Sequence, residues 1–143
     1  MARWAIANDH AGLPLKSVAL EAIRALGHEV IDLGTNSTDS VDYPDFAHAL
    51  AAKVASGEAD RGVLICGSGI GVSIAANRHK GVRAALCSEP LSASLSRQHN
   101  DANVLCMGAR LSGPALAEAM IRAFDATAYE GGRHQRRVDK LDG

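Results

Sequence analysis

Aromatic residues are scarce in this sequence and make up only 3% of its 143 residues. The core must therefore be built from Ala, Val, Leu and Ile, which suits helices packed closely on a sheet. No apolar run approaches the length of about 20 residues that a membrane-spanning helix needs. The net charge of −1 gives the whole chain no electrostatic attraction to a nucleic acid or a membrane surface. We therefore expect neither kind of partner.

Cysteines are few, and their spacing fits neither a disulfide framework nor a metal site. The sequence has three, Cys66, Cys87 and Cys106, and contains no Cys-x-x-Cys or His-x-x-x-His pair. An odd number of cysteines without framework spacing is typical of a reducing compartment. The N-terminal segment also reaches an acidic residue, Asp9, too soon for a secretory signal. We expect a cytoplasmic protein without a metal site.

Length and composition predict a single domain over residues 1–143. The four prolines each stand where a polar turn leads into an Ala- and Leu-rich stretch, which is where a helix accepts a proline. The predicted helices cover 13–26, 43–56, 69–78, 90–99 and 114–126, and the predicted strands cover Trp4–Ala7, Glu29–Leu33, Gly62–Cys66, Arg83–Cys87 and Asn103–Met107. This alternation predicts an α/β fold with a parallel sheet covered by helices on both faces.

The most informative stretch is a glycine-rich loop after the third predicted strand. Gly67, Gly69 and Gly71 separate an apolar strand from an Ala-rich helix. Such glycines let backbone N–H groups crowd towards an anion, and the helix N-terminus adds positive potential. Cys66 occupies the last strand position, where that N-terminus favours a thiolate. The loop predicts either a base or nucleophile beside an anion site, or a tight turn with a buried, inert cysteine.

Two nucleotide-binding motifs fit this loop incompletely. The dinucleotide fingerprint needs glycine or alanine at its sixth position, where this chain has Val72. Glu89 does lie about as far downstream as the ribose-binding acid of that fingerprint, so NAD binding stays open as a weaker alternative. The Gly-Lys-Ser/Thr sequence of a phosphate-binding P-loop is absent.

Polar residues that follow the predicted strands are the next candidates, because parallel sheets bind ligands beyond the carboxyl ends of their strands. Asp9 and His10 follow the first strand and form either an acid/base pair or the cap of the next helix. His99 and Asn100 end the fourth predicted helix, where they also suit a helix C-cap.

The C-terminal segment carries a short basic run. If it is helical after Gly132, Arg133 and Arg137 share one face. Two neighbouring guanidinium groups are often arranged around an anion. The alternatives are a solvated basic tail and a nucleic-acid contact.

Six segments, in order and spread over essentially the whole chain, carry a resemblance to a known family. They are Asn8–Gly12, Asp42–Ala47, Ile65–Gly71, Cys87–Pro90, Ser96–Leu105 and Glu130–His134. Together they resemble the type B ribose-5-phosphate isomerases, a group that also includes enzymes for galactose 6-phosphate and other sugar phosphates. The resemblance implies a three-layer Rossmann-like sandwich with a five-stranded parallel sheet and an additional C-terminal helix. It also implies aldose–ketose isomerisation through an enediolate, without metal or cofactor.

The resemblance assigns roles residue by residue. Cys66 is the base that moves a proton between C2 and C1, since the glutamate of other members has no counterpart among Val72–Ala75. Asp9 and His99 open the furanose ring, and Ser68 adds a hydroxyl to the amides that hold the enediolate. The implied substrate-binding residues are Asn8, Asp9, His10, Gly67, Ser68, Gly69, Ile70, Gly71, Asn100, Arg110, Arg133 and Arg137.

The resemblance also implies a homodimer, or a pair of dimers, with shared active sites. His99, Asn100 and the tail of residues 129–143 would then reach the Cys66 of a neighbouring subunit. Three alternatives remain at this point. They are an isomerase of a tetrose, allose 6-phosphate or galactose 6-phosphate, a nucleotide- or CoA-binding module, and a nucleic-acid partner of the basic tail.

Overall fold

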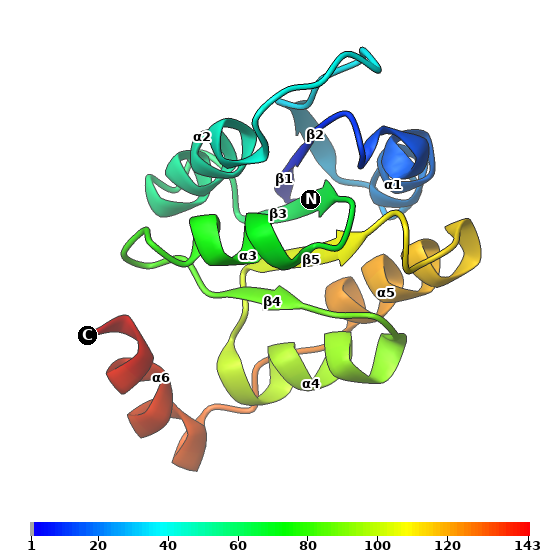
Figure 1. The fold of residues 1–143 in the computed structure, drawn as a ribbon. Coiled ribbons are helices and arrows are strands. Elements are labelled where there is room, and N and C mark those ends of the chain that lie inside the picture. The colour runs from blue at the N-terminus through cyan, green and yellow to red at the C-terminus, as the bar shows by residue number, and fades with distance from the viewer. Residues whose placement is uncertain (1) are drawn as a thin grey trace.

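The computed structural model describes residues 2–143 and has the expected parallel sheet, with strand order β2-β1-β3-β5-β4 (Figure 1). The strands are β1 (Arg3–Asn8), β2 (Glu29–Asp32), β3 (Arg61–Cys66), β4 (Ala84–Leu86) and β5 (Val104–Gly108). The helices are α1 (Lys16–Ala25), α2 (Tyr43–Ala55), α3 (Ile70–Ala76), α4 (Pro90–Asn100), α5 (Pro114–Ala126) and α6 (Gln135–Asp142), with short 3-10 turns at Leu13–Leu15 and Gly132–His134. The predicted fold class is confirmed.

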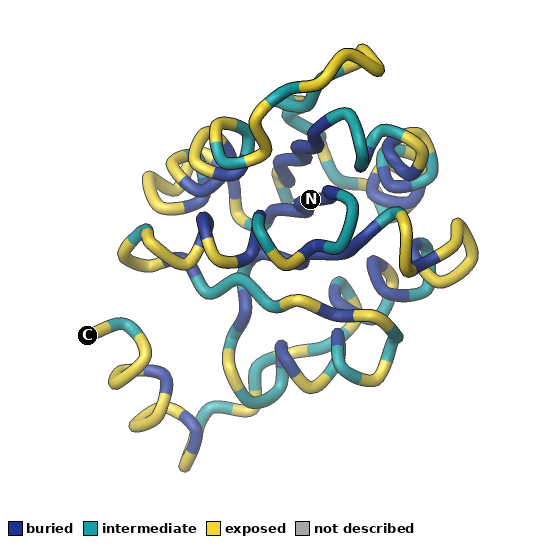
Figure 2. Tube along the Cα trace, viewed as in Figure 1, coloured by how far each residue is buried: buried dark blue, intermediate teal, exposed yellow. Residues whose placement is uncertain are grey.

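Helices cover both faces of the sheet, as the alternating pattern predicts. The α1, α4 and α5 helices pack on one face, and α2 and α3 pack on the other (Figure 1). Successive strand side chains point to opposite faces, so Ile65 contacts the first layer while Leu64 and Cys66 contact the second. The central strands β1, β3 and β5 are the buried part of the molecule, and exposed residues lie on the outer helix surfaces (Figure 2).

Three local expectations need correction. The first predicted helix begins with a separate 3-10 turn at Leu13–Leu15. At the end of α4, Asp101 rather than Asn100 takes the left-handed conformation, with φ of 47°. Glu89 caps the N-terminus of α4, where its carboxylate accepts hydrogen bonds from the amides of Leu91 and Ser92 at 2.6 and 2.8 Å. The acid that kept NAD binding open therefore has a structural role.

The segment after Gly132 is helical, as expected, and it contacts its own chain. Both oxygens of Asp142 accept hydrogen bonds from Nη1 of Arg83, at 3.0 and 2.9 Å. Val138 is buried, although most of α6 is exposed (Figure 2). Among residues 2–143, no helix combines the length and apolar character needed to cross a membrane.

The loop after β1 lies so close to β3 that only glycine fits at position 12. A Cβ atom at Gly12 would collide with the backbone carbonyl oxygen of Ile65. We expect Gly12→Ala to lower the free energy of unfolding by about 1–3 kcal/mol, as overpacking does. Gly113→Ala is the matched control because a Cβ there meets no atom within 4 Å. Urea denaturation of both variants measures the difference, and equal midpoints would contradict the close approach.

Candidate active site

A cavity of about 570 Å³ lies beyond the carboxyl ends of β1, β3 and β5, where parallel sheets bind ligands. Its walls are Asp9, His10, Ala11, Tyr43, Cys66, Gly67, Ser68, Ile70, Gly71, Ile74, Arg110 and Leu111. Most of the residues expected at the site from the strand ends and the glycine loop are therefore brought together. The residues from α4 and the tail are not.

The glycine loop presents the Cys66 sulfur and free backbone amides to this cavity. Sγ of Cys66 accepts a hydrogen bond from the amide of Gly69 at 3.2 Å. Gly69 has φ of 80°, and a Cβ there would lie 2.8 Å from the backbone of Met107, so the loop needs glycine at this position. Within residues 2–143, the amides of Gly67 and Ser68 donate to no acceptor. They are available to an anionic ligand.

The three free thiols differ in their surroundings. Burial raises the pKa of Cys106 well above its usual value, and the neighbouring Cys66 and Cys87 add to this effect. Burial also raises the pKa of Cys87. These two thiols therefore stay protonated at neutral pH. Cys66 is the cysteine that lines the cavity and accepts an amide hydrogen bond, which makes it the candidate base.

Asp9 and His10 are each held by one backbone amide. Oδ1 of Asp9 accepts a hydrogen bond from the amide of Gly12 at 2.9 Å. Nδ1 of His10 accepts one from the amide of Val41 at 3.1 Å. Because Nδ1 is an acceptor, Nε2 of His10 carries the ring proton and is the donor available to a ligand. Both side chains belong to the cavity wall.

Tyr43 and Arg110 lie on either side of the glycine loop. A Cβ at Gly71 would collide with the Tyr43 ring, so the ring rests on the loop backbone. The guanidinium group of Arg110 lies 3.4–3.5 Å from the Cβ position of Gly67. Arg110 is among the substrate-binding residues that the resemblance implies, whereas Tyr43 is not. Two signals for Tyr43 were present, its position beside Pro44 at the start of a helix and its place in Asp42–Ala47, one of the segments that carry the resemblance.

Two predicted substrate contacts lie behind the wall of the cavity. Asn8 is fully buried, and its amide group donates to the carbonyl oxygens of Asp9 and Thr35 at 3.0 and 3.1 Å. The Nδ2 group of Asn8 ties the loop after β2 to the loop after β1, while its buried Oδ1 has no hydrogen-bond partner among residues 2–143. Substrate binding by Asn8 stays a prediction. Gly69 is also buried, and its backbone amide donates a hydrogen bond to the Cys66 sulfur.

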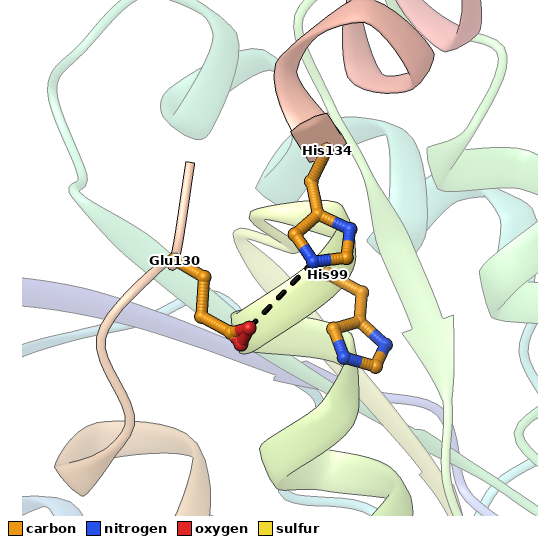
Figure 3. Close-up of side chains that lie close together, drawn as sticks. All are labelled: His99, Glu130 and His134. Atoms are coloured by element: carbon orange, nitrogen blue, oxygen red, sulfur yellow. Dashed lines mark ion pairs between the residues drawn. The ribbon is translucent and has the colours of Figure 1, made fainter. Parts of the chain in front are cut away.

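His99, Asn100, Arg133 and Arg137 lie apart from the cavity. The α4 helix starts at the carboxyl end of β4 and returns the chain towards the start of β5, so its last residues are at the opposite edge of the sheet (Figure 1). Asn100 lines a separate cavity beside Arg83. The His99 ring stacks on His134, with ring centroids 4.6 Å apart (Figure 3).

Arg133 and Arg137 are exposed and lie on consecutive turns, where Nη1 of Arg137 donates to the Arg133 carbonyl oxygen at 3.2 Å. Their shared helix face, which the sequence predicted, is present. Neither arginine is part of the wall of the cavity that holds Cys66 in the same chain.

The fold and the cavity define an enzyme-like site for a small anionic ligand, and comparison with known proteins identifies its family. The family described as Ribose/Galactose Isomerase matches residues 4–141. Ribose-5-phosphate isomerase B of Escherichia coli is 50% identical over 141 residues, which cover 99% of this chain and 95% of that protein. A sugar phosphate isomerase of Bacillus subtilis, named as putative, is 49% identical over 96% of this chain and 93% of its own length.

Solved structures agree. The type B ribose 5-phosphate isomerase of Trypanosoma brucei has a TM-score of 0.96 and 46% identity, with 99% of this chain and 97% of that chain covered. Ribose 5-phosphate isomerase B of Anaplasma phagocytophilum has a TM-score of 0.91 and 50% identity, covering 99% of this chain and 97% of that one. The chain therefore belongs to the ribose/galactose isomerase family. This confirms the family assignment that the resemblance of its sequence predicted.

The different settings of the three thiols predict an order of alkylation. Cys66 should react with iodoacetamide before Cys87 and Cys106, because only Cys66 lines the large cavity while burial keeps the others protonated. Peptide mass spectrometry over a time course measures the order. Prior labelling of Cys87 or Cys106 would contradict this account of the site.

Proposed function

We propose that this chain is an aldose–ketose isomerase that interconverts ribose 5-phosphate and ribulose 5-phosphate, with Cys66 as the base. The observation that carries the proposal is the Cys66 sulfur at the cavity wall, beside the unpaired amides of Gly67 and Ser68. The names of the similar proteins from Escherichia coli and Trypanosoma brucei support the choice of substrate.

The reaction needs a base, a site for the enediolate oxygen and an anchor for the phosphate. Cys66 removes the proton from C2 of the open-chain aldose and returns it to C1, while the proton of the C2 hydroxyl moves to the C1 oxygen, so that C1 becomes the alcohol and C2 the carbonyl. The amides of Gly67 and Ser68, with the Ser68 hydroxyl, stabilise the negative charge that develops on the oxygen between these steps. Ser68 is already fixed, because its Oγ accepts a hydrogen bond from the amide of Ile70 at 3.2 Å. No metal or cofactor takes part in this scheme.

The phosphate anchor combines groups from two places. His10 and Arg110 lie at the cavity, where an Nε2–H group and a guanidinium group can bind a phosphate dianion. Arg133 and Arg137 would complete the anchor from a second copy of the chain. Binding energy from the phosphate, which does not react, then holds C1 and C2 against Cys66.

The separation of these groups within one chain supports a homodimer with shared sites. Asp9 and Cys66 lie at one edge of the sheet, and His99 lies at the other. The cavity rim also exposes large apolar side chains, since Ile70 is 51% and Leu111 is 68% exposed. A second copy that covers this rim would bring His99 and Asn100 to Cys66. The three free thiols suit a reducing compartment such as the cytoplasm.

A panel of aldose phosphates tests this function. The purified chain should convert ribose 5-phosphate to ribulose 5-phosphate, also after exhaustive treatment with EDTA, and should exchange the C2 proton with D₂O. Cys66→Ala should lower kcat more than about 100-fold and abolish the exchange, since a positioned base contributes at least this much. Cys87→Ala and Cys106→Ala are the controls and should stay active.

Turnover of a tetrose, allose or galactose phosphate alone would move the chain to a different substrate within its family. Near-normal turnover and exchange by Cys66→Ala would remove Cys66 from the role of base. Activity that disappears with EDTA and returns with a divalent ion would contradict the metal-free scheme.

A further inference from the structure

The His99 ring has no polar partner that fixes its orientation. No hydrogen bond or ion pair joins it to any other residue from 2 to 143, which leaves both ring nitrogens free to act on a substrate. The ring torsion of a histidine is soft and roughly two-fold, so such a ring samples several orientations. The contact that orients His99 is the stack on His134, with ring planes 18° apart (Figure 3).

His134 is itself buried, beside a carboxylate. Only 8% of the residue is exposed, and its Nε2 lies 3.6 Å from Oε1 of Glu130 (Figure 3). The backbone amide of Glu130 donates to the carbonyl oxygen of Gln98 at 3.1 Å. Gln98 is the residue before His99, so this hydrogen bond fixes the Glu130 backbone directly beside the ring that His134 covers.

Two glycines make this arrangement possible. Gly131 and Gly132 have φ of 66° and 56°, which side chains rarely tolerate, and they turn the chain back between Glu130 and His134. The amide of His134 closes this turn on the carbonyl oxygen of Gly131 at 3.1 Å. The sequence Glu-Gly-Gly-Arg-His therefore builds a fixed support for the last turn of α4.

A bound metal ion is a poorer explanation of the same cluster. The ligand atoms of His99, Glu130 and His134 lie within 4.8 Å of one another, which is close enough to suggest one. The two imidazole rings are nearly parallel and stacked, however, so their nitrogen lone pairs lie in two separate, nearly parallel planes, which disfavours convergence on one ion. The geometry instead suits one ring that supports another.

We propose that His134, held by Glu130, is a positioning residue that orients His99 for opening the furanose ring of the substrate. The inference rests on the proposed function and extends it to residues without a role there. In ring opening, one member of the Asp9–His99 pair accepts the proton of the anomeric hydroxyl. The bond between C1 and the ring oxygen breaks, the C1 carbonyl forms, and the other member gives a proton to the ring oxygen. Both transfers require a His99 ring in one defined orientation.

The chemistry of the two substrates separates this step from proton transfer at carbon. Ribose 5-phosphate is mainly a furanose and must be opened. Ribulose 5-phosphate cannot form a furanose, because the hydroxyl that would close the ring carries the phosphate. Exchange of its C1 proton with D₂O therefore needs the base and the enediolate site but no ring opening.

The experiment compares His134→Ala, His134→Phe and Glu130→Gln with the wild-type dimer. Conversion of ribose 5-phosphate is measured as kcat and KM, and deuterium exchange into ribulose 5-phosphate is followed by NMR. His28→Ala is the matched control. His28 also stacks on a ring, that of Trp4 at 5.1 Å, and also pairs with a carboxylate, that of Asp125 at 2.6 Å, but it has no place in the proposed site.

We expect His134→Ala to lower kcat for ribose 5-phosphate by ~10-fold to ~100-fold, the scale of a misplaced reacting group, while exchange into ribulose 5-phosphate changes less than ~3-fold. His134→Phe keeps a flat ring under His99 and should recover most of the lost rate. Glu130→Gln, which keeps its size, should show the same pattern more weakly. His28→Ala should lower the thermal midpoint without separating the two activities.

Three results would overturn the inference. They are equal losses of both activities in His134→Ala and Glu130→Gln, a rise in KM for both substrates with kcat unchanged, and His134→Phe no better than His134→Ala. The first two would mean that the cluster only maintains the tail or the phosphate anchor. The wild-type protein is assayed before any variant. If it catalyses neither conversion nor exchange, the result contradicts the proposed function itself.

Discussion

The parallel arrangement of the sheet is the constraint on which the rest of the structure depends. Each strand that ends at one edge must be followed by a helix that carries the chain back to the other edge. Residues at strand ends, such as Asp9 and Cys66, therefore gather at one edge, while His99 at the end of α4 is carried to the opposite edge. One chain thus holds two separate sets of candidate site residues, and the proposed dimer would bring them together.

Close backbone packing sets the detail of the first set of groups. The loop after β1 touches β3 at Gly12, and the glycine loop touches β5 at Gly69. These approaches leave no room for a Cβ. They also let the Asp9 carboxylate and the Cys66 sulfur accept hydrogen bonds from backbone amides of their own loops, those of Gly12 and Gly69. Glycines also shape the surroundings of His99. The positive φ angles of Gly131 and Gly132 turn the chain so that Glu130 lies beside His134, the residue that stacks on His99.

The fold could be predicted from the sequence because its signals are local. Prolines and glycines mark the ends of helices, and short apolar runs mark the strands. Cys66 and its glycine loop could be predicted as a candidate site for the same reason, because strand, turn and helix follow each other within a few residues. The place of Arg133 and Arg137 on one helix face also followed from their spacing.

Contacts between distant segments could not be predicted in this way. Tyr43 reaches the site only because α2 packs on α3, which brings its ring onto Gly71. Asn8 stands at a strand end in the sequence, but only the structure shows that it is fully buried and donates a hydrogen bond to the carbonyl oxygen of Thr35. The stack of His134 on His99 joins segments that are 35 residues apart. Both residues lie in segments that carry the resemblance, but nothing in the sequence indicates that these segments meet.

The most direct test of the central claim is to mix two inactive chains. His99→Asn removes the imidazole proposed to open the furanose ring, and Cys66→Ala removes the thiol proposed as the base. The two groups lie at opposite edges of the sheet. If the site is shared between copies, a hybrid dimer has one site with both groups intact, and mixing should restore activity in proportion to the hybrids counted by native mass spectrometry. Hybrids that form and remain inactive would contradict the account, because they would place both groups in the site of a single chain or show that the two sites depend on each other.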